Sequence, residues 1–268
     1  MIKTLKYVLV LLLIWQNSSA VCQGFTYRKI DNRAFDVGEK LRFKVYYQSF
    51  LTGKVNAGTA TLEVKNTNRK FHRREVFHIV GNGKSNPAFD MFFKVRDRYE
   101  TYMDKDALIP HLFIRRTREG GYTKNDDVYF DHENGIATSS RTTKSITPNI
   151  QDIISAVYYM RTINFDDARV GQNFSVDFFL DDSAYVSVIQ FVGREVVEIE
   201  LGIFHCLAFK PMVATGEVFS NPYPMKLWVT DDKNKLPILA KSEVIVGSVV
   251  MELTDFSGLS NPVEAKIK

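Results

Sequence analysis

The sequence predicts an all-β protein: a large, antiparallel, curved sheet, arranged as a half-barrel or as a barrel or sandwich, with one helix at about residues 149–162 packed against it. Three observations support this prediction. Apolar and polar residues alternate with a period of two through most of the chain, and turn-forming residues separate the alternating segments at regular intervals. A single segment has helical spacing instead.

The N-terminal half of the chain contains clear strand patterns. Leu41, Phe43 and Val45 alternate with polar residues, which is typical of a half-buried strand. Thr52-Gly53 predicts a turn into a second strand at residues 59–65. Further turns, at Gly120-Gly121 and Glu133-Asn134-Gly135, separate later strands. These later strands are expected at residues 75–81, 93–101, 111–118, 128–131 and 136–139.

The segment at residues 149–162 breaks this rhythm. Thr147-Pro148 resembles an N-cap followed by a proline in the first turn of a helix. The wide apolar stripe of this helix predicts packing against the concave face of the sheet. The helix either closes one end of the core or covers a ligand cavity as a lid. The stripe consists of Ile150, Ile153, Ile154, Val157 and Tyr158.

Strand patterns return in the last third of the chain. Asp181-Asp182-Ser183 has the composition of a turn between strands at residues 174–180 and 184–192. Gly247 is expected at a bulge or bend. The other strands predicted here cover residues 195–201, 227–230, 236–239, 244–250 and 251–256.

The first twenty residues have the features of a secretory signal. Lys3 and Lys6 precede an apolar run at residues 7–15 that is too short to cross a bilayer, and Ser18-Ser19-Ala20 supplies small residues for cleavage. We therefore expect an exported protein, either periplasmic or associated with the outer membrane. The expected organisation is a signal peptide at 1–20, a tail at 21–33, a single β domain at 34–256 and a second tail at 257–268.

The two cysteines bear on how the chain is processed. Cys22 follows Val21, whereas a lipoprotein signal needs a small residue before the modified cysteine, so cleavage after Ala20 is favoured over a lipid on Cys22. An oxidising compartment would allow Cys22 to pair with Cys206. The apolar neighbours at residues 201–207 instead favour a buried, inert Cys206 thiol.

Charge and composition exclude several classes of function. The 268 residues carry 35 Lys and Arg against 31 Asp and Glu, a net charge of +4, and removal of residues 1–20 lowers it to +2. This near balance, together with export, predicts no nucleic-acid partner. No later apolar run is long enough for a membrane helix, so membrane contact is expected to be peripheral or through a lipid on Cys22.

Segments near both ends of the chain carry a family resemblance. The segments are AFDVGEKL at residues 34–41, NAGTA at 56–60, LWVTDD at 227–232 with Leu236-Pro237, and VGSV at 246–249. They resemble the bacterial family of unknown function numbered 3108, over nearly all of the chain after the signal. Members with this pattern are exported proteins of Gram-negative bacteria, often Bacteroidetes. The resemblance implies an all-β envelope domain and implies no activity, because the family has no established catalytic residues.

Side chains that usually carry chemistry form no recognisable motif here. The five histidines, at positions 72, 78, 111, 132 and 205, lack the close spacing of a zinc site, so we expect no metal and no cofactor. The four Asp pairs, at 126–127, 166–167, 181–182 and 231–232, suit turns better than the paired acids of a glycosidase. No phosphate-binding glycine loop or nucleophile elbow is present, and we nominate no catalytic residues.

A cluster of arginines is the first candidate for binding. Arg96 and Arg98 share one face of a predicted strand, and Arg116 and Arg118 share one face of a strand soon after it. If the strands are neighbours, the four guanidinium groups form a basic patch suited to phosphate or carboxylate groups. Alternatively, nearby acids neutralise them across the strands. Those acids are Asp97, Glu100 and Glu119.

Aromatic and helical residues are the second candidate. The chain has 20 Phe and 12 Tyr, and an aromatic ring with a polar tip suits an apolar pocket with wet edges. Tyr99 is therefore expected to line a ligand cavity, together with Ile153, Val157 and Tyr158 of the predicted helix. Ordinary packing in the core of a large β domain is the alternative for the same residues.

Three functions remain open from the sequence. The leading hypothesis is non-enzymatic binding of an apolar ligand such as a lipid, or of an apolar segment of an envelope protein, against the concave face of the sheet. The first alternative is a structural or assembly factor that acts through the basic patch. The second alternative is a glycan or peptide hydrolase. An open cavity favours the first, a filled interior with an exposed patch favours the second, and a cleft with two acids or a His–acid pair favours the third.

Overall fold

The computed structural model describes residues 25–51, 53–212, 225–244 and 247–267. The predicted signal peptide and Cys22 lie outside these residues, so processing and the pairing of Cys22 with Cys206 stay predictions. Of the two cysteines, Cys206 is described: it is buried, and burial raises the pKa of its thiol to about 12.

Fifteen strands form one antiparallel sheet in the described part of the chain. The strands are β1 (Lys40–Ser49), β2 (Gly53–Lys65), β3 (Lys70–Phe71), β4 (Arg74–Ser85), β5 (Val95–Asp104), β6 (Pro110–Glu119), β7 (Tyr122–Asp131), β8 (Ile136–Thr138), β9 (Thr143–Ser145), β10 (Asn173–Leu180), β11 (Ser183–Ile199), β12 (Gly202–Pro211), β13 (Met225–Thr230), β14 (Pro237–Glu243) and β15 (Ser248–Ser257). The described helices are α2 (Pro87–Asp90) and α3 (Ile153–Met160).

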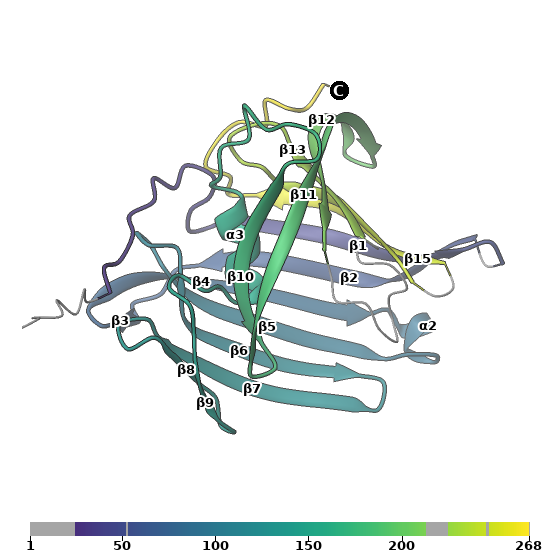
Figure 1. Ribbon diagram of the computed structural model, residues 1–268. Coiled ribbons are helices and arrows are strands. Elements are labelled where there is room, and N and C mark those ends of the chain that lie inside the picture. Colours follow the sequence, from purple (N-terminus) through teal and green to yellow (C-terminus); the bar gives the residue numbers. More distant parts are fainter. Residues whose placement is uncertain (1–24, 52, 213–224, 245–246, 268) are drawn as a thin grey trace, which may run out of the picture.

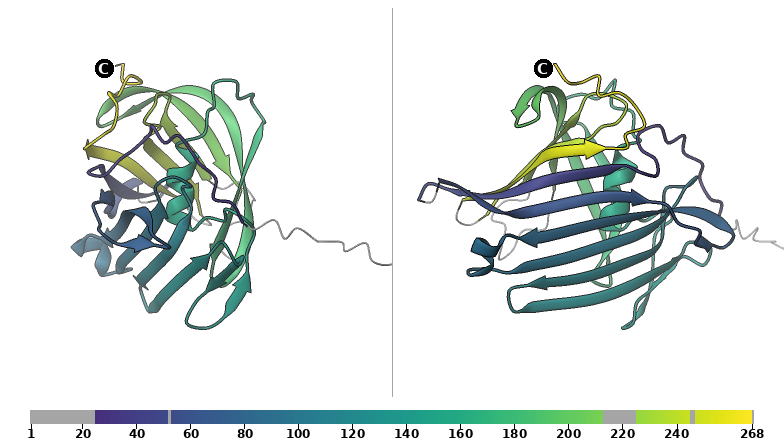
Figure 2. Two further views of the ribbon diagram at one scale, coloured as in Figure 1. Left: turned by 90° about the vertical axis from the view of Figure 1, so that its left-hand side faces the viewer. Right: turned by 180° about the vertical axis from the view of Figure 1, so that it is seen from behind.

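The sheet is curved and open. Its strand order is β10-β11-β12-β13-β14-β15-β1-β2-β4-β5-β6-β7-β8-β9, with β3 paired to β4 at one side. Within the described residues no ladder joins β9 to β10, so the sheet curls without closing. The end-on view shows α3 enclosed by the curled sheet (Figure 2, left), and the arrangement of all elements is drawn in Figure 1. The prediction of an all-β, antiparallel, curved sheet with a helix packed against it is confirmed, in its half-barrel form.

Helix α3 starts later than the sequence predicted. We expected it to begin at residue 149, but Gln151 is extended and pairs with β10: its N–H donates to the carbonyl of Asp177 and its carbonyl accepts from the N–H of Phe179, both at 2.8 Å. The helix begins after Asp152, whose carboxylate accepts the N–H groups of Ile154 and Ser155 at 2.8 Å. This capping box replaces the Thr147-Pro148 start.

The other differences concern strands and turns. β12 was not predicted as a strand, and β11 continues through Gly193 as one strand of 17 residues with a change of register there. Asp126 and Asp127 lie in the middle of β7 and not in a turn. Both predicted tails contact the body: the N–H of Ile30 donates to the carbonyl of Asp106, and that of Ile267 donates to the carbonyl of Ile203.

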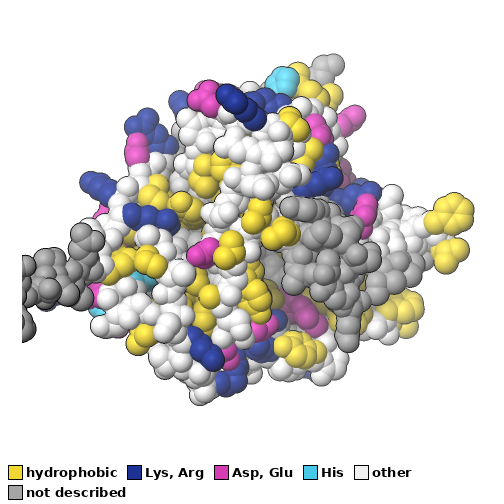
Figure 3. Space-filling model, viewed as in Figure 1, with side chains coloured by type: hydrophobic (Ala, Val, Ile, Leu, Met, Phe, Trp, Pro, Cys, Tyr) yellow, Lys and Arg dark blue, Asp and Glu magenta, His cyan; other side chains and the backbone are white. Residues whose placement is uncertain are grey.

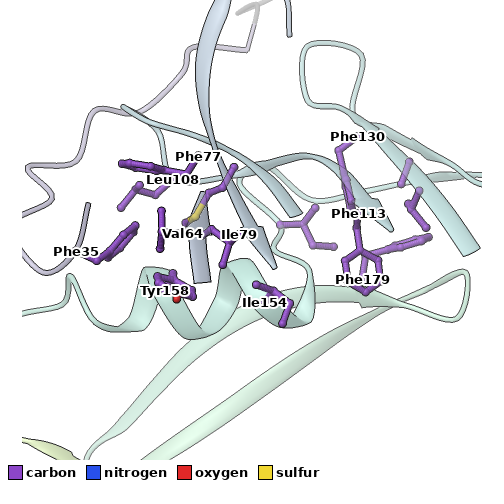
Figure 4. Close-up of a cluster of buried hydrophobic side chains, with 14 of the residues drawn as sticks. Phe35, Val64, Phe77, Ile79, Leu108, Phe113, Phe130, Ile154, Tyr158 and Phe179 are labelled. Atoms are coloured by element: carbon purple, nitrogen blue, oxygen red, sulfur yellow. The ribbon is translucent and has the colours of Figure 1, made fainter. Parts of the chain in front are cut away.

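A dense core fills the space between α3 and the strands from β2 to β7. Tyr158 and Ile154 lie on the side of α3 that faces Val64 and Ile79 (Figure 4), and the ring of Tyr158 meets that of Phe35 edge to face, with centroids 4.7 Å apart. Ion pairs hold the tip of the β10–β11 hairpin against β6, β7 and the β8–β9 turn. Asp181 pairs with Arg115 and Lys124, and Asp182 pairs with Arg141.

Candidate functional site

An apolar cavity of about 560 Å³ lies on the other side of α3, between the helix and the inner faces of β10 to β15. This volume is in the usual range for small-molecule sites. The helix contributes Ile153, Ala156, Val157 and Met160. The strands contribute mainly aliphatic and aromatic side chains, namely Leu62, Val176, Phe178, Ile189, Phe209, Leu227, Val229, Ala240, Val249 and Met251.

The spacing of residues along α3 explains why one helix has two different surroundings. Ile154 and Tyr158 are four residues apart and share the side that is buried in the dense core. Ile153 and Val157 are also four residues apart, but they face the cavity, where Val157 keeps 40 % of its surface exposed. The apolar stripe is therefore wide because it serves both regions.

The cavity has two distinct ends. One end is formed by Phe165, Arg161 and Lys235. The other end is formed by residues at or next to the ends of strands, namely Pro211 of β12, Met225 of β13, Ser242 of β14 and Val249 of β15. The register pairs Tyr47 and Gln48 of β1 with Val249 and Ser248 of β15, so this second end lies at the same end of the sheet as the β1–β2 turn.

A buried ion pair closes the first end of the cavity. The Arg161 guanidinium donates to both carboxylate oxygens of Glu39 at 2.6 Å, and Nε donates to the carbonyl of Asn234 at 3.0 Å. Both charged side chains are almost completely buried, so each depends on the other for compensation. Burial also lowers the pKa of Lys235, although Asp166, Asp232 and Asp231 act in the opposite direction.

The structure separates the predicted site residues into three places. Ile153 and Val157 line the cavity. Tyr158 is on the opposite side of α3 and is completely buried in the core. Tyr99 packs against the same core beside Phe113, with ring centroids 6.3 Å apart. Neither tyrosine lines the cavity.

The four arginines do lie together, but on the outer face of the sheet. β5 and β6 are neighbours, and the register sets Arg96 opposite Arg118 and Arg98 opposite Arg116. Residues directly opposite each other share a face, and Tyr99, which follows Arg98 along the strand and so points to the other face, packs against the inner core. The guanidinium groups are thus separated from the cavity by the sheet itself.

Carboxylates neutralise most of this arginine cluster. Arg98 pairs with Glu100 at 2.7 Å, on the same strand β5 and not across strands as the sequence alternative expected. The partners of Arg96 and Arg116 are instead Asp90 and Asp127, both at 2.5 Å. The Asp97 carboxylate accepts the backbone N–H of Arg118 at 3.1 Å.

The acidic and imidazole side chains do not converge on the cavity. No Asp, Glu or His among the described residues lines it. Asp126 is held by Arg141 at 2.9 Å, and Asp127 by Arg116, so these acids are bound to guanidinium groups. Over the same part of the chain, no cluster of three His, Cys, Asp or Glu side chains could hold a metal ion. Two His–acid contacts occur elsewhere, His78 with Glu100 at 2.6 Å and His111 with Asp104 at 3.1 Å, and neither pair lines the cavity.

Most cavity residues were not identified from the sequence. Met160, Phe165, Phe209 and Leu227 belong to segments read as strand, helix end or loop, and no motif distinguishes them from core residues. The width of the apolar stripe on α3 is the one sequence feature that indicates the cavity. Residues 153 and 157 lie on one side of the helix and residues 154 and 158 on another, so the helix needs apolar surroundings on both sides.

The chain belongs to a family of proteins of unknown function. The family model described as "Protein of unknown function (DUF3108)" matches residues 42–254. This confirms the resemblance derived from the sequence. No curated protein matches the chain.

Two solved structures match most of the length of this chain. One is a β-barrel-like protein of the domain of unknown function DUF1849 from Brucella abortus, 10 % identical, with a TM-score of 0.54; the match covers 84 % of this chain and 98 % of that one. The other is described as a candidate exported protein with a YmcC-like fold from Bacteroides fragilis, 10 % identical, with a TM-score of 0.34; it covers 87 % of this chain and 99 % of that one. The first supports the β-barrel-like fold. No helix among the described residues is long and apolar enough to cross a membrane.

Proposed function

We propose that the protein binds an apolar chain, such as the acyl chain of a lipid, in the cavity between α3 and β10–β15, and that it catalyses no reaction there. The observation that carries the proposal is the cavity itself: about 560 Å³ lined by aliphatic and aromatic side chains. The pocket is partly open to solvent, since Val157 keeps 40 % of its surface exposed, and its apolar walls are left in contact with water. A bound apolar chain would remove this surface from water, which is favourable.

The cavity also distinguishes the proposal from its alternatives. A filled interior was the expectation for an assembly factor that acts only through the arginine cluster, and three of those four arginines are paired with carboxylates. A hydrolase would need acids or imidazoles at the cavity. We further propose export to the cell envelope, on the N-terminal signal pattern and the composition of the chain.

The proposal is tested by titrating the full chain with a series of straight-chain primary alcohols and measuring affinity by calorimetry. Burial of each added methylene contributes about 0.8 kcal/mol, so the affinity is expected to rise about fourfold per carbon until the cavity is full. Val157→Trp places an indole ring in the cavity and narrows it without filling it, so it is expected to weaken binding of the longer alcohols. Val186→Trp is the matched control, because Val186 is exposed on β11 and its neighbour Ser187 faces the cavity. Equal binding by both variants, or no dependence on chain length, would contradict the proposal.

A further inference from the structure

Exposed apolar side chains gather at one end of the sheet. Phe50 and Leu51, at the β1–β2 turn, are 102 % and 86 % exposed, and Met91 and Phe92, between α2 and β5, are 84 % and 85 % exposed. Figure 3 shows hydrophobic side chains at the right-hand end of the molecule, where Figure 1 draws the β1–β2 hairpin and α2. Large apolar residues clustered on exposed loops mark an interaction surface.

The segment that contains α2 is joined to β2, several residues along the strand from the turn that carries Phe50 and Leu51. The Asn86 side-chain amide donates to the carbonyl of Asn56 at 2.6 Å, and its backbone N–H donates to the carbonyl of Ala57 at 2.9 Å, which joins the start of α2 to β2. The Phe93 ring lies against Gly120, where a Cβ atom would come within 2.8 Å of it. The loop after α2 is therefore fixed between the β1–β2 hairpin and the β6–β7 turn, and its apolar side chains remain exposed.

A row of basic side chains lies directly behind these loops. Lys84, Arg96 and Arg118 are opposite one another across β4, β5 and β6, and each is one residue from the strand end next to the loops. Lys94 directly follows the apolar segment. Asp90 pairs with Arg96. Asp97 and Glu119 are each adjacent in sequence to one of these arginines. Side chains alternate between the two faces of a strand, so these two carboxylates face the inner side of the sheet. The outer side behind the loops thus has an excess of positive charge.

We infer that this end of the sheet docks on the surface of an anionic lipid bilayer, with Phe50, Leu51, Met91 and Phe92 entering the boundary between headgroups and acyl chains. Apolar side chains on projecting loops with cations behind them match the layered chemistry of that surface, in which apolar chains lie beneath charged headgroups. The end of the cavity formed by Pro211, Met225, Ser242 and Val249 lies at the same end of the sheet. A chain leaving the bilayer there would have a short path to the cavity.

The inference is tested by co-sedimentation of the full chain with vesicles of phosphatidylcholine and phosphatidylglycerol, and with vesicles of phosphatidylcholine alone. The mass of the purified chain records whether its N-terminus carries a lipid. We expect binding to the anionic vesicles that weakens at high salt. Phe50→Ser combined with Phe92→Ser should weaken binding at least tenfold, since burial of one such side chain corresponds to about tenfold in affinity or more. Lys84→Ser combined with Lys94→Ser should weaken it by about fivefold for each charge removed.

Control variants show whether these loops, and not exposed apolar residues in general, contact the bilayer. Val196→Ser removes an apolar side chain that is 61 % exposed near the other end of β11, and it should leave binding unchanged. The emission of Phe92→Trp should shift to shorter wavelength on anionic vesicles. Unchanged binding in the Phe50/Phe92 variant, or an unshifted emission, would overturn the inference. Self-association that this variant abolishes, without vesicle binding, would overturn it in favour of a second copy of the chain. Alcohol binding should be unaffected by these variants, so failure here is distinguishable from failure of the proposed cavity ligand.

Discussion

Helix α3 separates two regions of the concave surface that have similar composition and different packing. On the side of β2 to β7, Ile154 and Tyr158 meet a core in which Val64, Ile79 and Phe113 are completely or almost completely buried. On the side of β10 to β15, the equally apolar residues of helix and strands surround a cavity of about 560 Å³. Apolar composition therefore does not decide whether a region is filled. The difference lies in whether side chains from opposite walls reach each other.

This difference in packing changes how the two regions use their apolar surface. In the filled region, burial and dense packing stabilise the fold. In the hollow region, the apolar side chains that line the cavity are not packed against other parts of the protein, so they remain free to contact a ligand. The buried pair of Glu39 and Arg161 stands at the boundary, at the C-terminal end of α3. Four experiments test this division, from the largest expected effect to the smallest.

Glu39→Gln should have the largest effect. It leaves the buried Arg161 guanidinium without its countercharge, and loss of one partner of a buried pair costs about 3–5 kcal/mol of unfolding free energy. Urea unfolding measures this loss. Asp255→Asn is the matched control, because it breaks the exposed pair with Arg42 and should cost less than about 1 kcal/mol. Equal losses in the two variants would show that the boundary is not built on the buried pair.

Ile154→Ala and Val157→Ala compare the two sides of the helix directly. Ile154 is buried in the filled region, and its truncation should cost about 2–5 kcal/mol. Val157 faces the hollow region, and its truncation should cost less than about 1 kcal/mol because few contacts are lost. Both values come from urea unfolding of the ligand-free chain. A cost for Val157→Ala as large as that for Ile154→Ala would mean that the cavity is filled by the chain in solution.

Asp152→Asn tests the filled side through pH. Burial raises the pKa of Asp152 to about 6, although Thr101 and the N–H groups of Ser155 and Ile154 act in the opposite direction. A carboxyl group whose pKa is higher in the folded state than in the unfolded chain binds its proton more tightly when folded, so stability falls as pH rises from about 4 to about 6. The asparagine variant should lack this component.

The measurement for Asp152 is the difference in unfolding free energy between variant and wild type at several pH values. His132 also titrates in this range, since burial lowers its pKa to about 4 and its contribution is lost as pH falls. This contribution is common to both proteins and cancels in the difference. A difference that does not change between about pH 4 and about pH 6 would contradict the shifted pKa of Asp152.

Asp182→Asn should have the smallest effect on global stability. It weakens the partly exposed pair with Arg141, at 2.7 Å, which helps to hold the β10–β11 hairpin over the sheet. We expect a loss below about 1 kcal/mol and faster hydrogen exchange confined to residues near the hairpin tip. Exchange that is unchanged at the tip would show that this pair does not restrain the wall of the cavity.

Much of the fold could be predicted from the sequence because strands and turns leave local signals. The alternation at Leu41, Phe43 and Val45 and the turn at Asp181-Asp182 correspond to elements of the structure. The start of α3 could not be predicted, because Gln151 is held extended by hydrogen bonds to β10, which lies more than twenty residues further along the chain. Long-range pairing of this kind overrides a local helical pattern.

The candidate site was predicted only in part, for similar reasons. Ile153 and Val157 were named and line the cavity, but Tyr158 lies on the other side of the same stripe. Spacing shows which residues share a side of a helix, and it does not show which side meets a filled region. The arginines share strand faces as expected, while their partners Asp90 and Asp127 come from α2 and β7. Which face of a sheet is inner depends on how the whole sheet curls.

Native mass spectrometry of the chain, purified without detergent, tests the central claim most directly. The account predicts one bound molecule with an acyl chain per protein, released on unfolding, reduced in occupancy in Val157→Trp and retained in full by Val186→Trp. A mass equal to that of the protein alone, together with no uptake of added long-chain alcohol, would contradict the claim that the hollow side of α3 is a binding site.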